Sequence, residues 1–312
     1  MNTKTLFYIL KRILLALLTV WVVITITFFV MRAVPGGPFL SEKAVSEAAQ
    51  KALEAKYGLD KPLMEQYVTY LKDIVTKFDF GPSIKLRGRQ VIDVILDGMK
   101  TSVKLGLEAA FIALFSGIVL GCVAALCRNS ILDKIIMVIT TAFVSMPSFI
   151  MGTLLLLIFS VKLGVVPANG ETAKGLVLPV VTLSLYPMAY ITRLTRSSML
   201  DVLGQDYIRT ARSKGVPEKV VIWKHALRNA LLPVITSMGM SFGASLGGAV
   251  ICETVFGMPG LGMLIVSSIR QKDTPVVLAA TRFLAALFCI VMLVVDILYA
   301  YIDPRIKALY KS

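Results

Sequence analysis

The hydrophobic pattern of this chain consists of long apolar runs separated by shorter polar stretches. An α-helix rises about 1.5 Å per residue, so runs of this kind can cross a hydrocarbon core of about 30 Å. The pattern therefore predicts a polytopic, all-α membrane protein with six transmembrane helices. The predicted spans are Ile13–Met31, Leu105–Cys127, Ile135–Val161, Leu176–Ile191, Leu231–Phe256 and Val276–Ile302.

Three prolines interrupt the third and fourth predicted spans. They are Pro147, Pro179 and Pro187. A proline inside a membrane helix frees backbone carbonyls, and these are tolerated only where neighbouring helices or a wet cavity satisfy them. We therefore expect kinks at these positions.

The orientation of the spans follows from the charges in the loop 193–230. Positive side chains outnumber acidic ones there, and short loops rich in Lys and Arg stay in the cytoplasm. The N-terminus and the tail 303–312 are basic as well, so six spans leave both ends in the cytoplasm. The basic residues of the loop are Arg193, Arg196, Arg209, Arg212, Lys214, Lys219, Lys224 and Arg228.

With this orientation, residues 1–32 comprise the cytoplasmic N-terminus and the first span. The segment 33–104 then lies outside the cytoplasm. Three helices are expected in the external segment: Ser41–Tyr57, a helix opened by Pro62, and an amphipathic one at Val91–Ile95 on the membrane surface. The region 105–302 then forms the membrane core.

Composition agrees with a multi-pass membrane protein. Of the 312 residues, 56% are hydrophobic types, and the mean hydropathy is +0.78, which points to the bilayer as solvent. The net charge of +14 is explained mainly by membrane topology, so we expect no nucleic-acid partner.

The sequence holds few groups for bond chemistry. It contains no phosphate-binding loop of the G-x-x-x-x-G-K-[ST] type, so ATP is not expected to bind this chain. The one histidine, His225, falls in the basic loop, which disfavours an intramembrane Ser/His hydrolase. The four cysteines lie in apolar runs without a C-x-x-C pair, and no metal site or cofactor of this chain is expected.

The fifth predicted span carries glycines four residues apart at Gly239, Gly243 and Gly247. They share one helical face, which lets another backbone approach closely. Two interpretations stay open: tight packing alone, or a packed face that also borders a translocation pathway.

Acidic residues touch three spans, at Glu108, Glu253 and Asp296. Ionisable groups at membrane depth face a protein interior, a partner or water, and we expect structural hydrogen bonding for Glu253 and Asp296. Arg282, in the sixth span, has two open interpretations, extension toward the interface or pairing with Glu253.

The most informative stretch is Asp206–Pro233, which reads DYIRTARSKGVPEKVVIWKHALRNALLP. It resembles the conserved cytoplasmic loop of ABC-importer permeases, the EAA loop, in its peptide-transporter variant. Where the general pattern has Glu-Ala-Ala before a glycine, this chain has Arg209-Thr210-Ala211, and Ala211 and Gly215 are retained.

Further motifs extend the resemblance over nearly the whole chain. They are PGGPF at 35–39, EAKYGLDKP at 54–62, DFGPS at 79–83, ETVFGMPGLG at 253–262 and VDILYAYIDPR at 295–305. In order and spacing they look like the first of the two permease subunits of oligopeptide importers. The distinction from dipeptide, nickel or glycoside relatives rests mainly on PGGPF and DFGPS.

The resemblance implies a mechanism in which a short helix of the loop docks on an ATPase subunit. The residues that it implies for this coupling are Asp206, Arg209, Ala211, Gly215, Val216, Pro217, Val220, Trp223 and His225. Gly215 suits a turn beside that helix, and Val220, Val221 and Trp223 would supply a packing face. The alternative for this loop is simple contact with anionic lipid.

The resemblance also implies a place in the bacterial inner membrane and a set of partners. These are a homologous second permease, ATPase subunits that bind ATP and Mg, an extracytoplasmic peptide-binding protein and membrane lipid. The chain itself would then be a transporter subunit and not an enzyme. A proton-coupled secondary peptide carrier is the alternative function.

Overall fold

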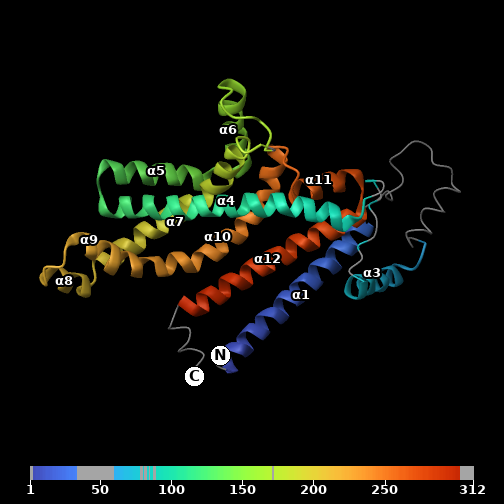
Figure 1. The fold of residues 1–312 in the computed structure, drawn as a ribbon, viewed down its shortest axis with the longest axis horizontal. Coiled ribbons are helices and arrows are strands. Elements are labelled where there is room, and N and C mark those ends of the chain that lie inside the picture. The colour runs from blue at the N-terminus through green and yellow to red at the C-terminus, as the bar shows by residue number, and fades with distance from the viewer. Residues whose placement is uncertain are drawn as a thin grey trace. The chain divides into compact units, whose positions relative to one another are not determined.

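The computed structural model describes residues 3–33, 60–77, 89–170 and 172–302, together with positions 80, 83, 85 and 86. All the regular elements of these residues are helices (Figure 1). They are α1 (Thr3–Ala33), α3 (Leu63–Lys77), α4 (Val91–Leu126), α5 (Ile131–Ser145), α6 (Ser148–Leu155), the π-helix η1 (Leu156–Lys162), α7 (Val177–Leu203), α8 (Asp206–Ser213), α9 (Glu218–Val220), the π-helix η2 (Val221–Leu227), α10 (Arg228–Val255), α11 (Leu261–Gln271) and α12 (Thr274–Ile302).

Four of these helices are long and apolar enough to cross a membrane, and a bent pair supplies a fifth candidate. The candidates lie at Leu10–Ala33, Val91–Leu126, Val177–Leu203 and Thr274–Val295, and the pair at Ile131–Ser145 with Ser148–Lys162. The remaining predicted span, the fifth at Leu231–Phe256, falls on α10. Most side chains in the middle of α10 lie outside the described part of the structure, so this span stays a prediction.

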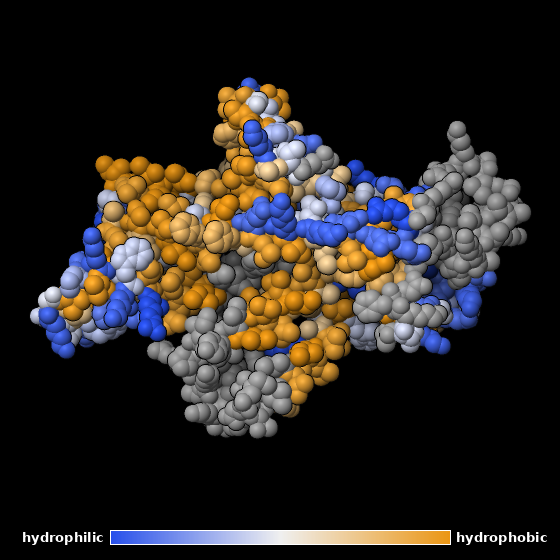
Figure 2. Space-filling view, in the orientation of Figure 1, coloured by the Kyte–Doolittle hydropathy of each residue, from blue (hydrophilic) through white to orange (hydrophobic). Residues whose placement is uncertain are grey.

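Lipid-facing surface accompanies these helices. On α5 the side chains of Ile131 and Val138 are 77% and 70% exposed, and on α4 Phe111 is 71% exposed. Figure 2 shows the broad apolar surface to which such side chains contribute. Exposing this apolar surface to water would cost free energy, whereas in a bilayer the lipid chains cover it.

The predicted third span is broken at Pro147. α5 ends at Ser145, Met146 is extended, and α6 begins at Ser148 with an axis bent by 108° from that of α5. The residue before a proline avoids the helical region, which explains why the break falls at Met146. The kink expected here is confirmed, but its size makes this a broken span or a re-entrant element. Pro187 lies inside α7, which continues past it.

The chain divides into two compact units, each described by itself. The first unit comprises Met1–Leu15, Ser102–Met258 and Phe288–Ser312, and the second comprises Ala16–Thr101 and Pro259–Leu287. In the first unit α7 packs against both α10 and α5 (Figure 1). One apolar core there joins α4, α7 and α10 through the buried residues Leu105, Ala109, Leu178, Val180, Leu183, Ala249, Cys252, Phe256 and Met258.

In the second unit the start of α4 is buried instead of lying on a membrane surface. Val91 and Ile95 are 0% exposed and pack with Leu261 of α11 and Val276 of α12. The separate amphipathic helix predicted at Val91–Ile95 is therefore wrong. Its apolar residues are the first turns of a continuous α4, and their burial against two other helices explains their pattern.

The helix predicted after Pro62 is confirmed as α3. Tyr67 of α3 packs on Phe28 of α1, with ring centroids 5.4 Å apart, and its hydroxyl is 2.7 Å from Thr25 Oγ1. These contacts attach α3 to the end of α1 in the second unit. The other predicted external helix, Ser41–Tyr57, lies outside the described residues.

The DFGPS motif is also anchored in the second unit. The hydroxyl of Ser83 donates to the buried carboxylate of Asp273, and the backbone N–H of Lys85 donates to the same oxygen at 3.2 Å. Asp273 immediately precedes α12. Ser83 thus has a structural role in holding the segment before α4 to the start of α12.

Candidate functional site

The loop segment Asp206–His225 folds into three short helical pieces that follow α7 and precede α10. α8 begins at Asp206, a turn at Gly215 ends it, and Pro217 precedes α9, which continues into η2. Proline before a first helical turn is favourable because the missing N–H is not needed there. We call Asp206–His225 the loop segment from here on.

The turn at Gly215 is a C-terminal cap of α8. Gly215 has φ of +71°, its N–H donates to Arg212 O at 2.9 Å, and the N–H of Val216 donates to Ala211 O at 3.2 Å. This pair of bonds is the Schellman motif, which places a left-handed residue one position past the helix end. The predicted turn at Gly215 is confirmed, and Ala211 and Val216 support it as half-buried residues of one apolar cluster.

An ion pair closes the same turn from outside. Arg212 Nη2 donates to Glu218 Oε1 at 2.6 Å and Nε donates to Oε2 at 3.1 Å. The hydrogen bonds from Arg212 hold the pKa of Glu218 below its ordinary value. Because both side chains are about half exposed, the pair sets the geometry of the turn more than its stability.

The inner face of the loop segment packs on the first unit. Ile208 and Val221 are 0% exposed, and they share a cluster with Cys122 of α4 and Met199 of α7. The outer face exposes Tyr207, Val220 and Trp223, the last at 66%. The prediction that Val221 belongs to the same face as Val220 and Trp223 is therefore wrong, since Val221 anchors the segment.

The remaining predicted residues of the segment lie at its surface. Asp206 and Arg209 are exposed, and Asp206 Oδ1 lies 3.8 Å from Arg209 Nη1. Pro217 is exposed as well. The backbone carbonyl of His225 accepts from Asn229 Nδ2 at 2.9 Å, and the same amide donates to the Tyr207 hydroxyl at 3.0 Å. This contact ties α8 to the start of α10.

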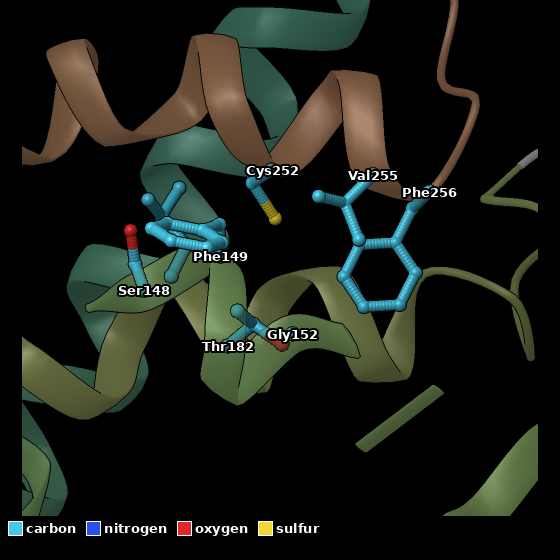
Figure 3. Close-up of a pocket in the computed structure, with 8 residues that line it drawn as sticks. Ser148, Phe149, Gly152, Thr182, Cys252, Val255 and Phe256 are labelled. Atoms are coloured by element: carbon cyan, nitrogen blue, oxygen red, sulfur yellow. The ribbon is translucent and has the colours of Figure 1, made fainter. Parts of the chain in front are cut away.

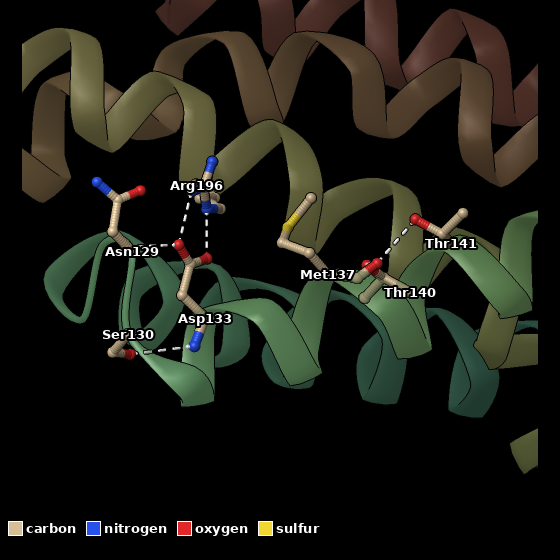
Figure 4. A network of polar contacts seen from close by, with 7 residues as sticks. All are labelled: Asn129, Ser130, Asp133, Met137, Thr140, Thr141 and Arg196. Atoms are coloured by element: carbon tan, nitrogen blue, oxygen red, sulfur yellow. Dashed lines mark hydrogen bonds and ion pairs between the residues drawn. The ribbon is translucent and has the colours of Figure 1, made fainter.

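A polar network that the sequence reading missed lies near the loop segment, on α5 and α7 (Figure 4). Arg196 of α7 binds Asp133 of α5 through two bonds of 2.7 Å, and the N–H of Asn129 donates to the same carboxylate at 2.9 Å. Asp133 is 3% exposed. Asn129 has φ of +64°, a conformation that asparagine tolerates better than most residues. The sequence held two signals of this network. Ser130 lies three residues before Asp133, which is a helix-capping pattern. Arg196 was used only as one of the positive charges that predict the topology.

Two further glycines, which sequence reading also missed, join α4 to α7. A Cβ added at Gly117 would lie 2.8 Å from Ile191 Cβ, and one at Gly121 would lie 2.7 Å from Thr192 O. Only glycine permits this approach, and the G-x-x-x-G spacing in the sequence was the available signal. Gly239, Gly243 and Gly247 lie on α10, in a part of the helix whose side chains are outside the described structure, so the predicted packing face stays a prediction. The side chain of Asp296 is also outside the described structure, and its predicted role stays a prediction.

The broken helix borders an apolar recess in the first unit (Figure 3). Its walls come from α6, α7 and α10. Inside, the Thr182 hydroxyl oxygen is buried without a hydrogen-bond partner, and Gly152 lets α6 approach Thr182 closely. The lining residues are Ser148, Phe149, Gly152, Thr182, Leu183, Cys252, Val255 and Phe256.

Glu253 lies next to this region, toward the end of α10. It is 0% exposed and accepts a hydrogen bond of 2.5 Å from Ser102 of α4. This agrees with the structural hydrogen bonding predicted for Glu253, and any role in a translocation pathway stays a prediction.

The sequence matches two known protein families. Residues 117–308 match the family described as "Binding-protein-dependent transport system inner membrane component". The chain belongs to this family of inner-membrane transport components. Residues 5–106 match the N-terminal family of such membrane components.

Individual members of the family are similar over nearly their whole length. The dipeptide transport system permease protein DppB of Bacillus subtilis is 47% identical over 301 residues, covering 96% of this chain and 97% of that protein. The oligopeptide transport system permease proteins OppB of Haemophilus influenzae and Escherichia coli K12 are 44% and 41% identical, each covering 96% of this chain and 99% of the relative.

Solved structures of this kind share the fold. The inward-facing MetNI methionine ABC transporter matches with a TM-score of 0.59 at 17% identity, covering 68% of this chain and 97% of that chain. An amino acid ABC transporter with histidines matches with a TM-score of 0.52 at 17% identity, covering 69% of this chain and 94% of that chain. The helical arrangement is thus that of ABC-transporter permeases.

Proposed function

We propose that this chain is the transmembrane permease subunit of an ATP-binding-cassette importer and forms half of a translocation pathway for oligopeptides. The observation that carries the proposal is the 47% identity to a dipeptide permease over 96% of the chain. The motifs PGGPF and DFGPS favour oligopeptides as cargo. Among the described residues no feature favours a proton-coupled carrier.

The topology in this proposal has six spans with both termini in the cytoplasm. The segment 33–104 is external, the core is 105–302, and the loop segment faces the cytoplasm. The charge of the loop 193–230 and the candidate spans support this arrangement.

In this orientation the outer face of the loop segment meets an ATPase subunit. Tyr207, Val220 and Trp223 offer exposed apolar area, and Arg209 and Lys219 offer positive charge beside it. A short helix seated in a groove by such side chains is a common mode of recognition. ATP and Mg bind the ATPase subunits in this proposal, and this chain carries no cofactor.

Three contacts transmit a movement of the loop segment into the membrane. Ile208 and Val221 fasten it to α4 and α7, Gly121 holds α4 on α7, and the Asp133–Arg196 pair holds α5 on α7. α5 leads through the Pro147 break to α6 and the recess. Packed elements with discrete contacts move as units, so closure of the ATPase subunits would shift α5 and α6 together with α7.

The remaining partners follow from the same proposal. A homologous second permease completes the pathway, an extracytoplasmic peptide-binding protein delivers cargo, and lipid surrounds the spans. Co-purification tests the proposal: in mild detergent the chain should come away with a second permease and ATPase chains. A chain that purifies alone, and whose peptide uptake in cells collapses with an uncoupler but survives ATP depletion, would contradict it.

A further inference from the structure

The second unit contains a buried guanidinium group that has no acidic partner among the residues that the structure describes. Arg282, in the membrane helix α12, is 6% exposed, which contradicts extension to the interface, one of its two open interpretations. Its Cζ lies 4.9 Å from the ring centroids of both Tyr70 and Phe80, and its Nη2 donates to the Tyr70 hydroxyl. Its Nε and Nη1 are buried and have no hydrogen-bond partner.

A second arginine lies one aromatic ring away from the same phenol. Arg32 is the last residue but one of α1, and its Cζ lies 5.4 Å from the ring centroid of Phe28. The ring centroids of Phe28 and Tyr70 are 5.5 Å apart. Its Nε is also buried without a partner. Burial raises the pKa of Tyr70, while the positive charges of Arg282 and Arg32 act in the opposite direction. We call Arg32, Tyr70 and Arg282 the arginine cluster.

The arginine cluster is short of negative charge. Among the described residues no carboxylate forms an ion pair with either arginine. Buried charges in proteins are paired, and cation–π contacts replace only part of the lost hydration. The planar fork of arginine fits a carboxylate or phosphate with two parallel bonds, so an oxyanion is the missing partner.

The surface beside the arginine cluster indicates where the oxyanion comes from. On α1 the side chains of Leu18, Val22, Ile26 and Val30 are exposed at intervals of about one turn, so the helix that carries Arg32 has an apolar stripe as far as its last turn, on another face from Arg32. Arg32 lies at the end of an apolar helix, the level at which headgroups meet the hydrocarbon core. A phospholipid beside the last turn of α1 therefore has its phosphate at the level of Arg32.

We propose that Arg32, Tyr70 and Arg282 form a binding site for the phosphate of an anionic phospholipid. Arg32 is half-buried and receives the phosphate first. The Tyr70 hydroxyl accepts from Arg282, so its own hydrogen is directed to a phosphate oxygen. The enclosed nitrogens of Arg282 complete the site when the Tyr70 and Phe80 rings turn aside. The bound lipid fastens α1, α3 and α12 at one end, and this role needs the membrane but not the transport function proposed above.

The test is native mass spectrometry of the full-length chain with the subunits that copurify in detergent, titrated with phosphatidylglycerol and, separately, phosphatidylcholine. Wild type should bind phosphatidylglycerol more tightly. Arg282→Gln should weaken this binding about ten- to a hundredfold, the usual effect of losing charged hydrogen bonds. Arg32→Gln and Tyr70→Phe, which disturb the interior less, should weaken it severalfold, and Arg282→Lys should restore part of it. Arg270→Gln is the matched control because Arg270 is an exposed arginine of the same unit.

Competition distinguishes the sources of the oxyanion. Inorganic phosphate should not displace phosphatidylglycerol at equal concentration, because it lacks the acyl chains that hold a lipid beside the apolar helices; equal displacement overturns the lipid assignment. Displacement by a tripeptide with a free C-terminus, but not by its amide, would assign the cluster to cargo carboxylate and overturn the proposal. It is overturned too if the Arg32→Gln and Arg270→Gln chains bind phosphatidylglycerol equally.

Discussion

At the residue scale, Asp133 shows how a single carboxylate can join two helices. It accepts three hydrogen bonds, two from Arg196 and one from the Asn129 backbone, and is almost fully buried. Removing one partner of such a pair leaves the other charge without compensation, which costs far more than the pair contributes over apolar residues. The pair therefore specifies one position of α5 on α7.

We expect Asp133→Asn to lower the melting temperature of the purified chain in detergent and Asp97→Asn to leave it nearly unchanged. Asp97 also pairs with an arginine, Arg89 at 2.7 Å, but both side chains are at least half exposed. A double variant with Arg196→Met should recover part of the loss, because no buried charge remains. Equal melting temperatures for the Asp133 and Asp97 variants would contradict a role of this pair in joining the helices.

At the element scale, the close approach of α4 and α7 depends on Gly121. The Cβ of an alanine there would lie 2.5 Å from Thr195 Cβ, so even one methyl group must separate the helices. We expect Gly121→Ala to destabilise the chain by about 1–3 kcal/mol and Gly121→Leu to prevent assembly.

Gly204→Ala is the control for that prediction, since its new Cβ would meet nothing closer than 3.6 Å. The amount of assembled complex and its melting temperature are the measurements. A Gly121→Ala chain as stable as the Gly204→Ala chain would show that the helices are not in close contact at this point.

The sequence predicted which segments cross the membrane better than it predicted how they meet. The length and polarity of the runs indicate α1, α4, α7 and α12 because these properties are local. Pro147 indicated a kink, but its angle of 108° depends on the packing of α6 against α7 and α10. The Asp133–Arg196 pair joins residues far apart in sequence, so neither side chain alone indicated it. Val221 was predicted to share a face with Val220 and Trp223. This was wrong because neighbouring residues of a short helix can face opposite ways.

At the scale of the whole molecule, the proposed orientation places the loop segment and the loop before α7 on opposite sides of the membrane. In a cysteine-free chain, Lys174→Cys should react with an impermeant thiol reagent in intact cells, and Ser213→Cys should react only after permeabilisation. Both positions are exposed. Gly170 is unsuitable as a reporter because its Cβ would lie 2.3 Å from Met258 Cγ. The opposite labelling pattern would reverse the orientation.

The central claim is that the loop segment transmits ATP hydrolysis to the membrane helices, and peptide-stimulated ATPase activity of the reconstituted complex tests it most directly. Gly215→Val strains a left-handed turn by about 1–3 kcal/mol, without a clash, since nothing lies within 4 Å of the new Cβ. Gly164→Val is the matched control, with φ of +63° and equally open space. We expect the Gly215→Val complex to retain its subunits and bind the loaded peptide-binding protein, yet lose most of the stimulation, while the Gly164→Val complex keeps it. Full stimulation and uptake in the Gly215→Val complex, at equal abundance, would contradict the account and favour a loop segment that only contacts lipid.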